Sequence, residues 1–261
     1  MIQNDIIIEN KPIKFERHKR ILDLLERNGF VKLKDLEQIL KTKRLTIQRD
    51  LIELEENNLL DRVHGGAIKK GLQLASQNYE TRVKTNLQMK SKIAKKAAEF
   101  INEGDTISMD GSTTAEQLVD YFNEIAITVL THSMGLFKKL TKIEKVNTIL
   151  TGGQYNKRTE NLIGLFASQT INNISFNKCF FSANGFDPAK GSIDFDVEDN
   201  IIKNAMIEKS EKVYLLIDST KIKNTMGILG CPIDKIDYII IDDDHDLNWS
   251  NEIKQKIIIA K

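Results

Sequence analysis

The first seventy residues carry apolar positions at helical spacing in three short runs. Helices are predicted over 15–28, ended by Gly29, over 34–40 and over 45–58. The run 59–70 instead alternates apolar and polar residues and turns through Gly65-Gly66, which is typical of a small β-wing. The positions expected to pack inward from these helices are Phe15, Ile21, Leu22, Leu24, Leu25, Leu36, Ile39, Leu40, Leu45, Ile47, Leu51 and Leu54.

After residue 90 the pattern changes to short apolar runs that alternate with helical ones. A helix over 89–101 opens this part. Because strands buried on both faces read as continuous apolar runs, the alternation predicts a mostly parallel sheet covered by helices. Strands are expected at 106–109, 127–131, 147–151, 178–183, 212–218 and 237–242, and helices at 114–122, 134–140, 160–172, 197–209 and 247–259.

These patterns divide the chain into four parts: an N-terminal tail (1–14), a winged helix-turn-helix domain (15–70), a partly helical linker (71–90) and an α/β domain (91–261). No apolar run approaches the roughly 20 residues that span a bilayer, and the N-terminus does not resemble a signal peptide. We therefore expect a soluble, cytoplasmic protein. Cys179 and Cys231 lack metal-ligand spacing, so we expect buried thiols, without a disulfide or a bound metal.

The net charge of +1 hides an excess of positive charge near the N-terminus. Residues 11–70 contain 15 Lys or Arg against 10 Asp or Glu, which leaves the rest of the chain mildly acidic. A basic module joined to an acidic remainder favours nucleic-acid binding. The third helix places polar and basic residues in its first turn, where a recognition helix meets the major groove. The candidate DNA-binding residues of this helix and the wing are Lys43, Arg44, Thr46, Gln48, Arg49, Arg62 and His64.

Polar side chains and glycines follow the predicted strands of the second domain. Ligands of parallel sheets bind beyond the carboxyl ends of the strands, so these residues are expected to form a site. The loop DGSTT precedes a predicted helix, whose free N–H groups and dipole favour a phosphate, and Lys221 can add a positive charge. The candidate effector-binding residues are Asp110, Gly111, Ser112, Thr113, Thr114, Thr131, Gly152, Gly153, Asn184, Gly185, Asp187 and Lys221.

Several of these motifs resemble the DeoR family of bacterial winged-helix repressors. They are TIQRDL (46–51) and VHGGA (63–67) in the first domain, and DGSTT (110–114), LTGG (150–153), ANGFD (183–187), KNAM (203–206) and IDSTK (217–221) in the second. The stretches FFSANGF and YLLIDSTKI look closest to the repressors of lactose and related phosphotransferase systems. The sequence departs from the family pattern at Gln48, where arginine is usual, at His132, where asparagine is usual, and at Ile201, where an acid is common. It also departs at Lys41 and Lys43, in a turn that usually has glycine and serine.

The resemblance implies an α+β winged helix-turn-helix domain joined to an α/β domain resembling ribose-5-phosphate isomerase. It implies a non-enzymatic regulator without a cofactor that binds an operator in double-stranded DNA, senses a phosphorylated sugar or related metabolite, and forms a homo-oligomer. Two alternatives stay open. One is an isomerase-like enzyme in which Asp187 is the base and Lys221 stabilises the enediolate. The other is a winged helix that binds RNA or protein.

Overall fold

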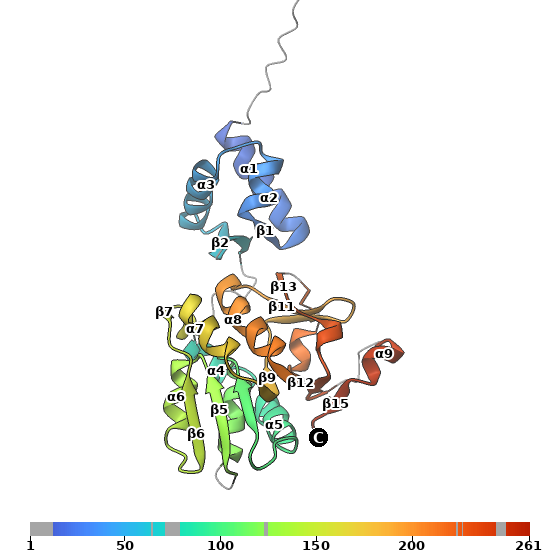
Figure 1. Ribbon diagram of the computed structural model, residues 1–261. Coiled ribbons are helices and arrows are strands. Elements are labelled where there is room, and N and C mark those ends of the chain that lie inside the picture. The colour runs from blue at the N-terminus through green and yellow to red at the C-terminus, as the bar shows by residue number, and fades with distance from the viewer. Residues whose placement is uncertain are drawn as a thin grey trace, which may run out of the picture. The chain divides into compact units, whose positions relative to one another are not determined.

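The computed structural model describes residues 13–63, 65–70, 79–122, 125–222, 224–225, 227–243 and 249–261. The chain forms two units, Met1–Ser76 and Gln77–Lys261, so the boundary falls inside the segment expected to be a linker. The first unit contains α1 (Lys14–Asn28), β1 (Phe30–Lys32), α2 (Leu33–Ile39), α3 (Arg44–Glu56), β2 (Leu60–Val63) and β3 (Gly66–Lys69), coloured from blue to blue-green in Figure 1.

The three helices of the first unit pack around a small apolar core, and β1 extends the wing to an antiparallel sheet of order β1-β3-β2. A Cβ at Gly66 would lie 1.9 Å from the carbonyl oxygen of Val31, so only glycine allows β3 to lie this close to β1. Three apolar residues predicted to face the core are instead exposed: Phe15 (75%), Ile39 (48%) and Leu45 (61%). Each lies in the first or last turn of its helix, beyond the reach of the core.

The second unit is built on a parallel sheet of order β15-β14-β12-β9-β4-β5-β6, which confirms the predicted α/β fold. From central β4 the chain builds outward to β6 on one side and later to β15 on the other, so the strand order reverses between β4 and β9. The strands are β4 (Thr106–Met109), β5 (Ile127–Thr131), β6 (Val146–Leu150), β9 (Phe176–Phe181), β12 (Ser210–Leu216), β14 (Tyr238–Ile241) and β15 (Ile257–Ile259).

Helices cover both faces of this sheet. One face packs against α5 (Leu87–Ala98), the 3₁₀ helix η1 (Ala115–Tyr121) and α6 (Met134–Leu140), and the other against α7 (Leu165–Asn172), α8 (Val197–Glu208) and α9 (Asn251–Lys254). Figure 1 shows α7 and α8 side by side on one face. Successive residues of β12 alternate between these layers, with Leu216 in the first core and Leu215 in the second. Both cysteines are free and buried, as predicted.

Two predicted helices are wrong in part. Residues 161–163 form β8, which pairs with β7 (Gln154–Asn156), and the helix begins only after Gly164. Ile257–Ile259 form β15 because three consecutive β-branched residues favour pairing with β14 over helix; residues 244–248 lie outside the described part. A separate antiparallel sheet joins β10 (Gly185–Asp187), β11 (Gly191–Asp194) and β13 (Ile228–Pro232). Of the helices described, none is long and apolar enough to span a membrane.

Candidate functional site

The carboxyl ends of β4 and β9 lie side by side at the point where the strand order reverses. Asp110, which follows β4, is buried there, and its carboxylate accepts hydrogen bonds of 3.1 Å from the backbone N–H groups of Ser112 and Ser182. Such a reversal opens a crevice in which ligands of open parallel sheets bind. Asp110 therefore fixes the loop DGSTT to the neighbouring strand end at this point of reversal.

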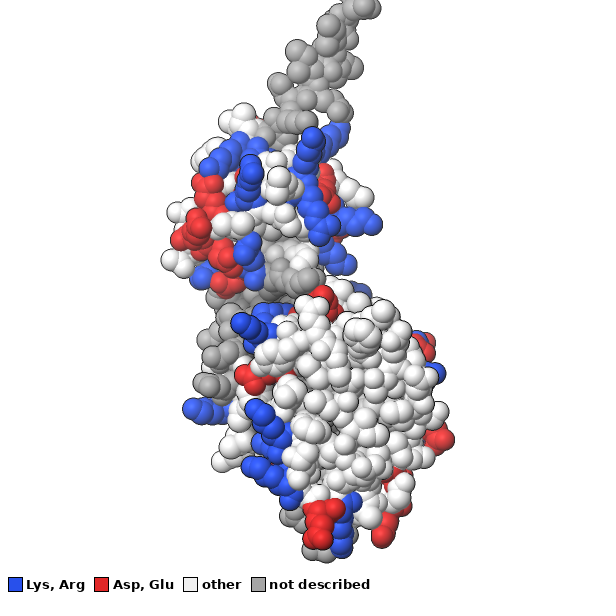
Figure 2. Space-filling view, turned by 60° about the vertical axis from the view of Figure 1, so that its left-hand side comes forward, with Lys and Arg blue, Asp and Glu red and all other residues white. Residues whose placement is uncertain are grey.

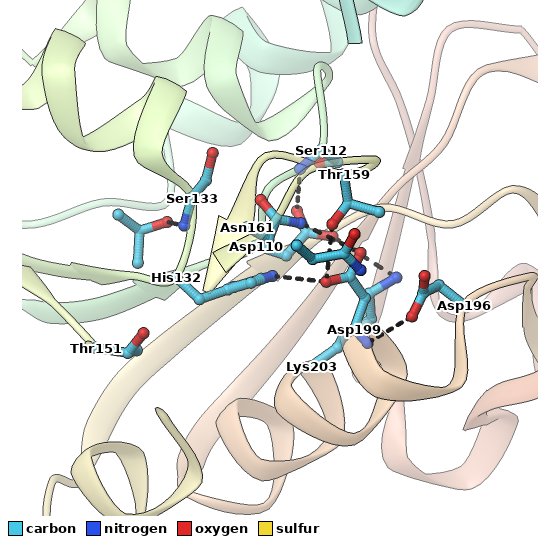
Figure 3. Close-up of polar contacts among 12 residues, drawn as sticks. Asp110, Ser112, His132, Ser133, Thr151, Thr159, Asn161, Asp196, Asp199 and Lys203 are labelled. Atoms are coloured by element: carbon cyan, nitrogen blue, oxygen red, sulfur yellow. Dashed lines mark hydrogen bonds and ion pairs between the residues drawn. The ribbon is translucent and has the colours of Figure 1, made fainter. Parts of the chain in front are cut away.

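A buried cation compensates the charge of Asp110. Lys203 of α8 lies with its Nζ 3.7 Å from Asp110 Oδ2; Figure 3 labels both residues. Its ammonium also donates hydrogen bonds to Asp194 Oδ2 at 2.9 Å and to the carbonyl of Ser182 at 2.7 Å. Burial lowers the pKa of Lys203, but the two carboxylates outweigh it, so the pKa is raised. The ammonium stays charged and links α8 to both strand ends.

The residues of the loop DGSTT have separate roles. A Cβ at Gly111 would lie 2.2 Å from Asn161 Oδ1, so this glycine makes room for the asparagine. The Ser112 hydroxyl caps η1 by accepting from the N–H of Ala115 at 3.1 Å. The Thr114 hydroxyl is buried without a hydrogen-bond partner in the described part of the chain. The following helix is a 3₁₀ helix of seven residues rather than the predicted α-helix, so its dipole is a weaker attraction for an anion.

A second lysine ties this loop to the start of the unit. Lys90 of α5 is buried, and its Nζ donates to Thr113 Oγ1 at 3.0 Å and to the carbonyl of Arg82 in α4 (Tyr79–Lys84). Burial, together with the nearby charge of Lys221, lowers the pKa of Lys90 to about 8. The hydroxyl of Tyr79, which like Arg82 belongs to α4, donates to the buried Glu116 carboxylate at 2.7 Å. Helix α4 is thus fastened to the site loop.

A second group of polar residues at this end of the sheet comes from β8, α8 and the end of β5. His132 is fully buried with its Nε2 4.0 Å from Asp199 Oδ1, and Asn161 donates to Asp199 Oδ2 at 3.3 Å (Figure 3). Burial lowers the pKa of His132 more than the charge of Asp199 raises it, which favours a neutral ring. Thr131 is buried and accepts from the N–H of Ser133, so its hydroxyl shapes the turn.

The remaining predicted residues differ in their surroundings. Gly152 and Gly153 are exposed with positive φ, and Gly153 packs closely on Ile163 and Ala167. Gly185 is buried so tightly that a Cβ would lie 2.0 Å from the Asn224 carbonyl oxygen, while the Asn184 carbonyl accepts from the Asn224 side chain. The Asp187 carboxylate accepts from the N–H of Ala189 at 2.9 Å within the β10–β11 hairpin, and Lys190 lies 3.2 Å from it.

Lys221 completes the polar edge. Its Nζ donates to the Ala183 carbonyl at 3.0 Å and lies 3.6 Å from Asp218, a fully buried carboxylate at the end of β12. Several buried side-chain atoms at this edge have no hydrogen-bond partner among the described residues, although buried polar atoms are normally satisfied. They belong to Thr114, His132, Asn161, Ser182 and Asp218. Together these atoms leave unused donors and acceptors at the polar edge of the sheet, where a polar ligand could bind.

In the first unit, α3 presents an outward face opposite its buried residues. Ile47, Asp50, Leu51 and Leu54 face the core, whereas Leu45, Gln48, Arg49 and Ile52 share the other side and are exposed. Lys43 and Arg44 are exposed beside them, and Thr46 is half-buried. No described residue forms an ion pair with Arg44 or Arg49, so both guanidinium groups can reach phosphates or base edges.

Two neighbouring contacts hold this helix in place. Asp50 is buried and binds Arg17 of α1 through two hydrogen bonds of 2.7 and 2.9 Å, so it anchors α3 rather than reading DNA. Arg62 of the wing is exposed but paired with Glu55 of α3 at 2.8 Å. His64, also predicted to bind DNA, lies outside the described residues.

Sequence reasoning missed four side chains that contact the polar edge: Lys90, Asn161, Asp199 and Lys203. Lys203 was noted only within a motif, and Asp199 precedes it by one helical turn, a spacing that places both on one face of α8. Asn161 fell within a segment predicted as helix. Lys90 lies at the end of the predicted linker and in the first turn of the helix predicted over 89–101, where the pattern gives no sign of a buried ammonium.

Both units match known families. Residues 17–70 match a DeoR-like helix-turn-helix domain and residues 85–243 a DeoR C-terminal sensor domain. The HTH-type transcriptional regulator GolR of Listeria innocua is 31% identical over 87% of this chain and 90% of its own length. A lactose phosphotransferase system repressor of Streptococcus mutans is 34% identical over 80% of this chain and 84% of its own.

A second lactose phosphotransferase system repressor, from Staphylococcus epidermidis, is 28% identical over 94% of this chain and 98% of its own. Among solved structures, ribose 5-phosphate isomerase A of Methanocaldococcus jannaschii is 13% identical, with a TM-score of 0.41 over 53% of this chain and 55% of its own. The family matches span both units and agree with the sequence motifs. The chain belongs to the DeoR family of helix-turn-helix transcriptional regulators.

Proposed function

We propose that this regulator represses a sugar-uptake or catabolic operon and leaves its operator when a phosphorylated sugar binds the second unit. The observation that carries the proposal is the polar edge at the β4–β9 reversal, where Lys90 and Lys221 bind residues of the strand ends and several buried polar atoms lack a hydrogen-bond partner among the described residues. The phosphate would lie near Thr114, Lys90 and Lys221. The sugar hydroxyl groups would reach His132 and Asn161, which offer the acceptors and donors that such groups need.

Release requires that the ligand bind one arrangement of the protein more tightly than another. Helix α4 offers a connection, because it follows the segment between the units and its Arg82 carbonyl accepts from Lys90 at the site. A phosphate that draws Lys90 toward itself would change this contact. The proposed operator is a duplex with two related half-sites, and a preference for RNA or for protein would contradict it.

A thermal-shift screen of the purified full chain against phosphorylated and unphosphorylated sugars tests the proposal. Ligand at about 100 times its Kd adds about 2.7 kcal/mol to the free energy of unfolding, which raises Tm by several degrees for a unit of this size. We expect this shift from a phosphorylated sugar and not from its unphosphorylated counterpart. The absence of a shift with every phosphorylated compound would remove the effector assignment.

The double variant Thr114→Val, Lys221→Met is expected to bind operator normally but to lose effector affinity by about 100-fold. Each change removes a donor to the phosphate, and a hydrogen bond to a charged group contributes about 1.5–3 kcal/mol. Calorimetric titration with the sugar phosphate selected by the screen measures the loss. Lys138→Met, at an exposed lysine of α6, is the matched control. Equal affinity in the double variant and the control would contradict the site.

Effector affinity is expected to fall as pH rises above about 8. The folded pKa of Lys90 is lowered to about 8, so its positive charge is present below that pH and lost above it. If the phosphate needs the ammonium, the affinity is about tenfold lower at pH 9, one unit above the pKa of Lys90, than at pH 7. Titrations at pH 7, 8 and 9 measure this trend. Lys90→Met should bind weakly at all three, and a pH-independent wild type would refute the role of Lys90.

We expect no catalysis. An isomerase would need Asp187 as a free base, whereas its carboxylate is held within the β10–β11 hairpin by Ala189 and Lys190. Incubation of the purified protein with pentose phosphates, followed by analysis for isomerised product, tests this. Turnover abolished by Asp187→Asn would favour the enzyme instead.

A further inference from the structure

One face of the second unit lacks charged side chains. Asp, Glu, Lys and Arg make up 29% of the chain, yet none occurs in residues 146–156 or 161–177. These two segments, called here the uncharged face, comprise β6, β7, β8, α7 and the first two residues of β9; the charged turn 157–160 between β7 and β8 lies outside them. Figure 2 shows a broad expanse of this unit occupied by white residues alone. A solvated surface normally mixes both charges, so this composition marks a surface that is covered.

Large apolar side chains protrude from this face. Leu165 and Phe166, at the start of α7, are 69% and 70% exposed, and Tyr155 of the adjoining β7–β8 hairpin is 48% exposed. Neighbouring Ile163 and Ala167 are buried, so α7 turns one side to the core and leaves these residues to the outside. Exposed aromatic and aliphatic groups gathered in this way are typical of the centre of a protein interface.

The uncharged face also contains an unprotected sheet edge. Strand β6 is the last strand of the sheet, and of the described strands only β5 pairs with it. Soluble proteins usually protect an edge with lysine or proline. Both edge strands follow a lysine, Lys145 before β6 and Lys256 before β15, but β15 is also followed within two residues by Lys261, whereas β6 and the loop after it carry no charge or proline.

We infer that the uncharged face joins two copies of this chain. A second copy is the occupant that fits, because an uncharged surface offers nothing to a charged partner and a two-fold axis sets the same apolar patch against itself. Twenty residues of the two segments are exposed or half-exposed, which matches the 20–30 residues per side of a stable interface. A helix-turn-helix regulator needs two copies to read two half-sites. The inference stands whether or not the polar edge at the β4–β9 reversal binds a sugar phosphate.

The double variant Leu165→Glu, Phe166→Glu tests the inference by sedimentation analysis of the full chain. Burying two carboxylates in the interface is expected to raise the dimer dissociation constant at least about 100-fold, since two central residues each contribute about 2 kcal/mol or more. Leu87→Glu, at a residue of α5 that is 49% exposed and lies outside the two segments, is the matched control and should remain dimeric. A folded double variant with wild-type mass would overturn the inference.

Hydrogen exchange of the wild type keeps the test decisive if the variant fails to fold. Backbone amides of residues 146–156 and 161–177 should exchange faster in dilute protein than in concentrated protein, while those of α5 should not change. A wild type that sediments as a monomer at about 100 μM, or unchanged exchange across a demonstrated dimer transition, would refute this interface. The sugar-phosphate proposal is tested separately by the thermal-shift screen, so the two proposals can fail independently.

Discussion

Replacing Lys203 with methionine is expected to lower the free energy of unfolding of the second unit by about 3–5 kcal/mol. The change leaves the buried carboxylates of Asp110 and Asp194 without their shared cation, and removing one partner of a buried ion pair costs this much. The loop DGSTT loses its anchor at the same time, so effector affinity should fall as well. Denaturant titration followed by circular dichroism measures the stability loss.

A surface lysine provides the comparison for this change. Lys212 of β12 is paired with Asp237 at 3.3 Å but is half-exposed, so Lys212→Met should cost less than about 1 kcal/mol. If Lys203→Met costs no more than Lys212→Met, the buried cluster does not stabilise the unit in the way described. Adding Asp194→Asn to Lys203→Met should recover part of the loss, because it removes one of the two unpaired charges.

The double variant Arg44→Ala, Arg49→Ala should lose operator affinity by about 100-fold or more while effector binding stays unchanged. Both residues belong to the exposed side of α3, and each base or phosphate contact contributes about 1–3 kcal/mol. Fluorescence anisotropy with a duplex selected from a random library by the wild type measures the loss. The dependence of affinity on salt should weaken by about one unit of slope for each phosphate contact removed.

The control for DNA binding is Arg27→Ala, which removes an exposed arginine from the last turn of α1. Its effect on operator affinity should be small. An equal loss in Arg27→Ala and in the double variant would mean that general positive charge, and not α3, holds the DNA. Retained affinity in the double variant would refute the recognition face altogether.

The winged helix could be predicted well because its signals are local. The buried residues of α3 repeat at intervals of three and four, and the turn before β3 carries its glycines in sequence. The prediction of inward packing failed at helix ends such as Leu45, because periodicity does not show that the core ends before the helix does. The motif TIQRDL also did not show that Asp50 pairs with Arg17 and does not contact DNA, because this ion pair joins residues 33 positions apart in the sequence.

The candidate effector site was predictable only as an edge of the sheet. The strand ends identified Asp110, Thr114 and Lys221, because parallel strands bring their carboxyl ends together. The rest of the site depends on tertiary contacts. Asn161 contacts Gly111 and Asp199 from a hairpin that the sequence pattern predicted to be helical. The counterion of Asp110 lies 93 residues away, a separation that no local pattern reveals.

The contacts between α4 and the site loop determine where a chimaeric regulator can place its domain junction. A chimaeric regulator that takes its second unit from this chain at residue 91, where sequence places the domain, would leave behind Tyr79, Arg82 and Lys90 and so lose their bonds to Glu116 and Thr113. A junction at Gln77 keeps them within one transferred module. Domain exchange between such regulators should therefore place its boundary ahead of α4.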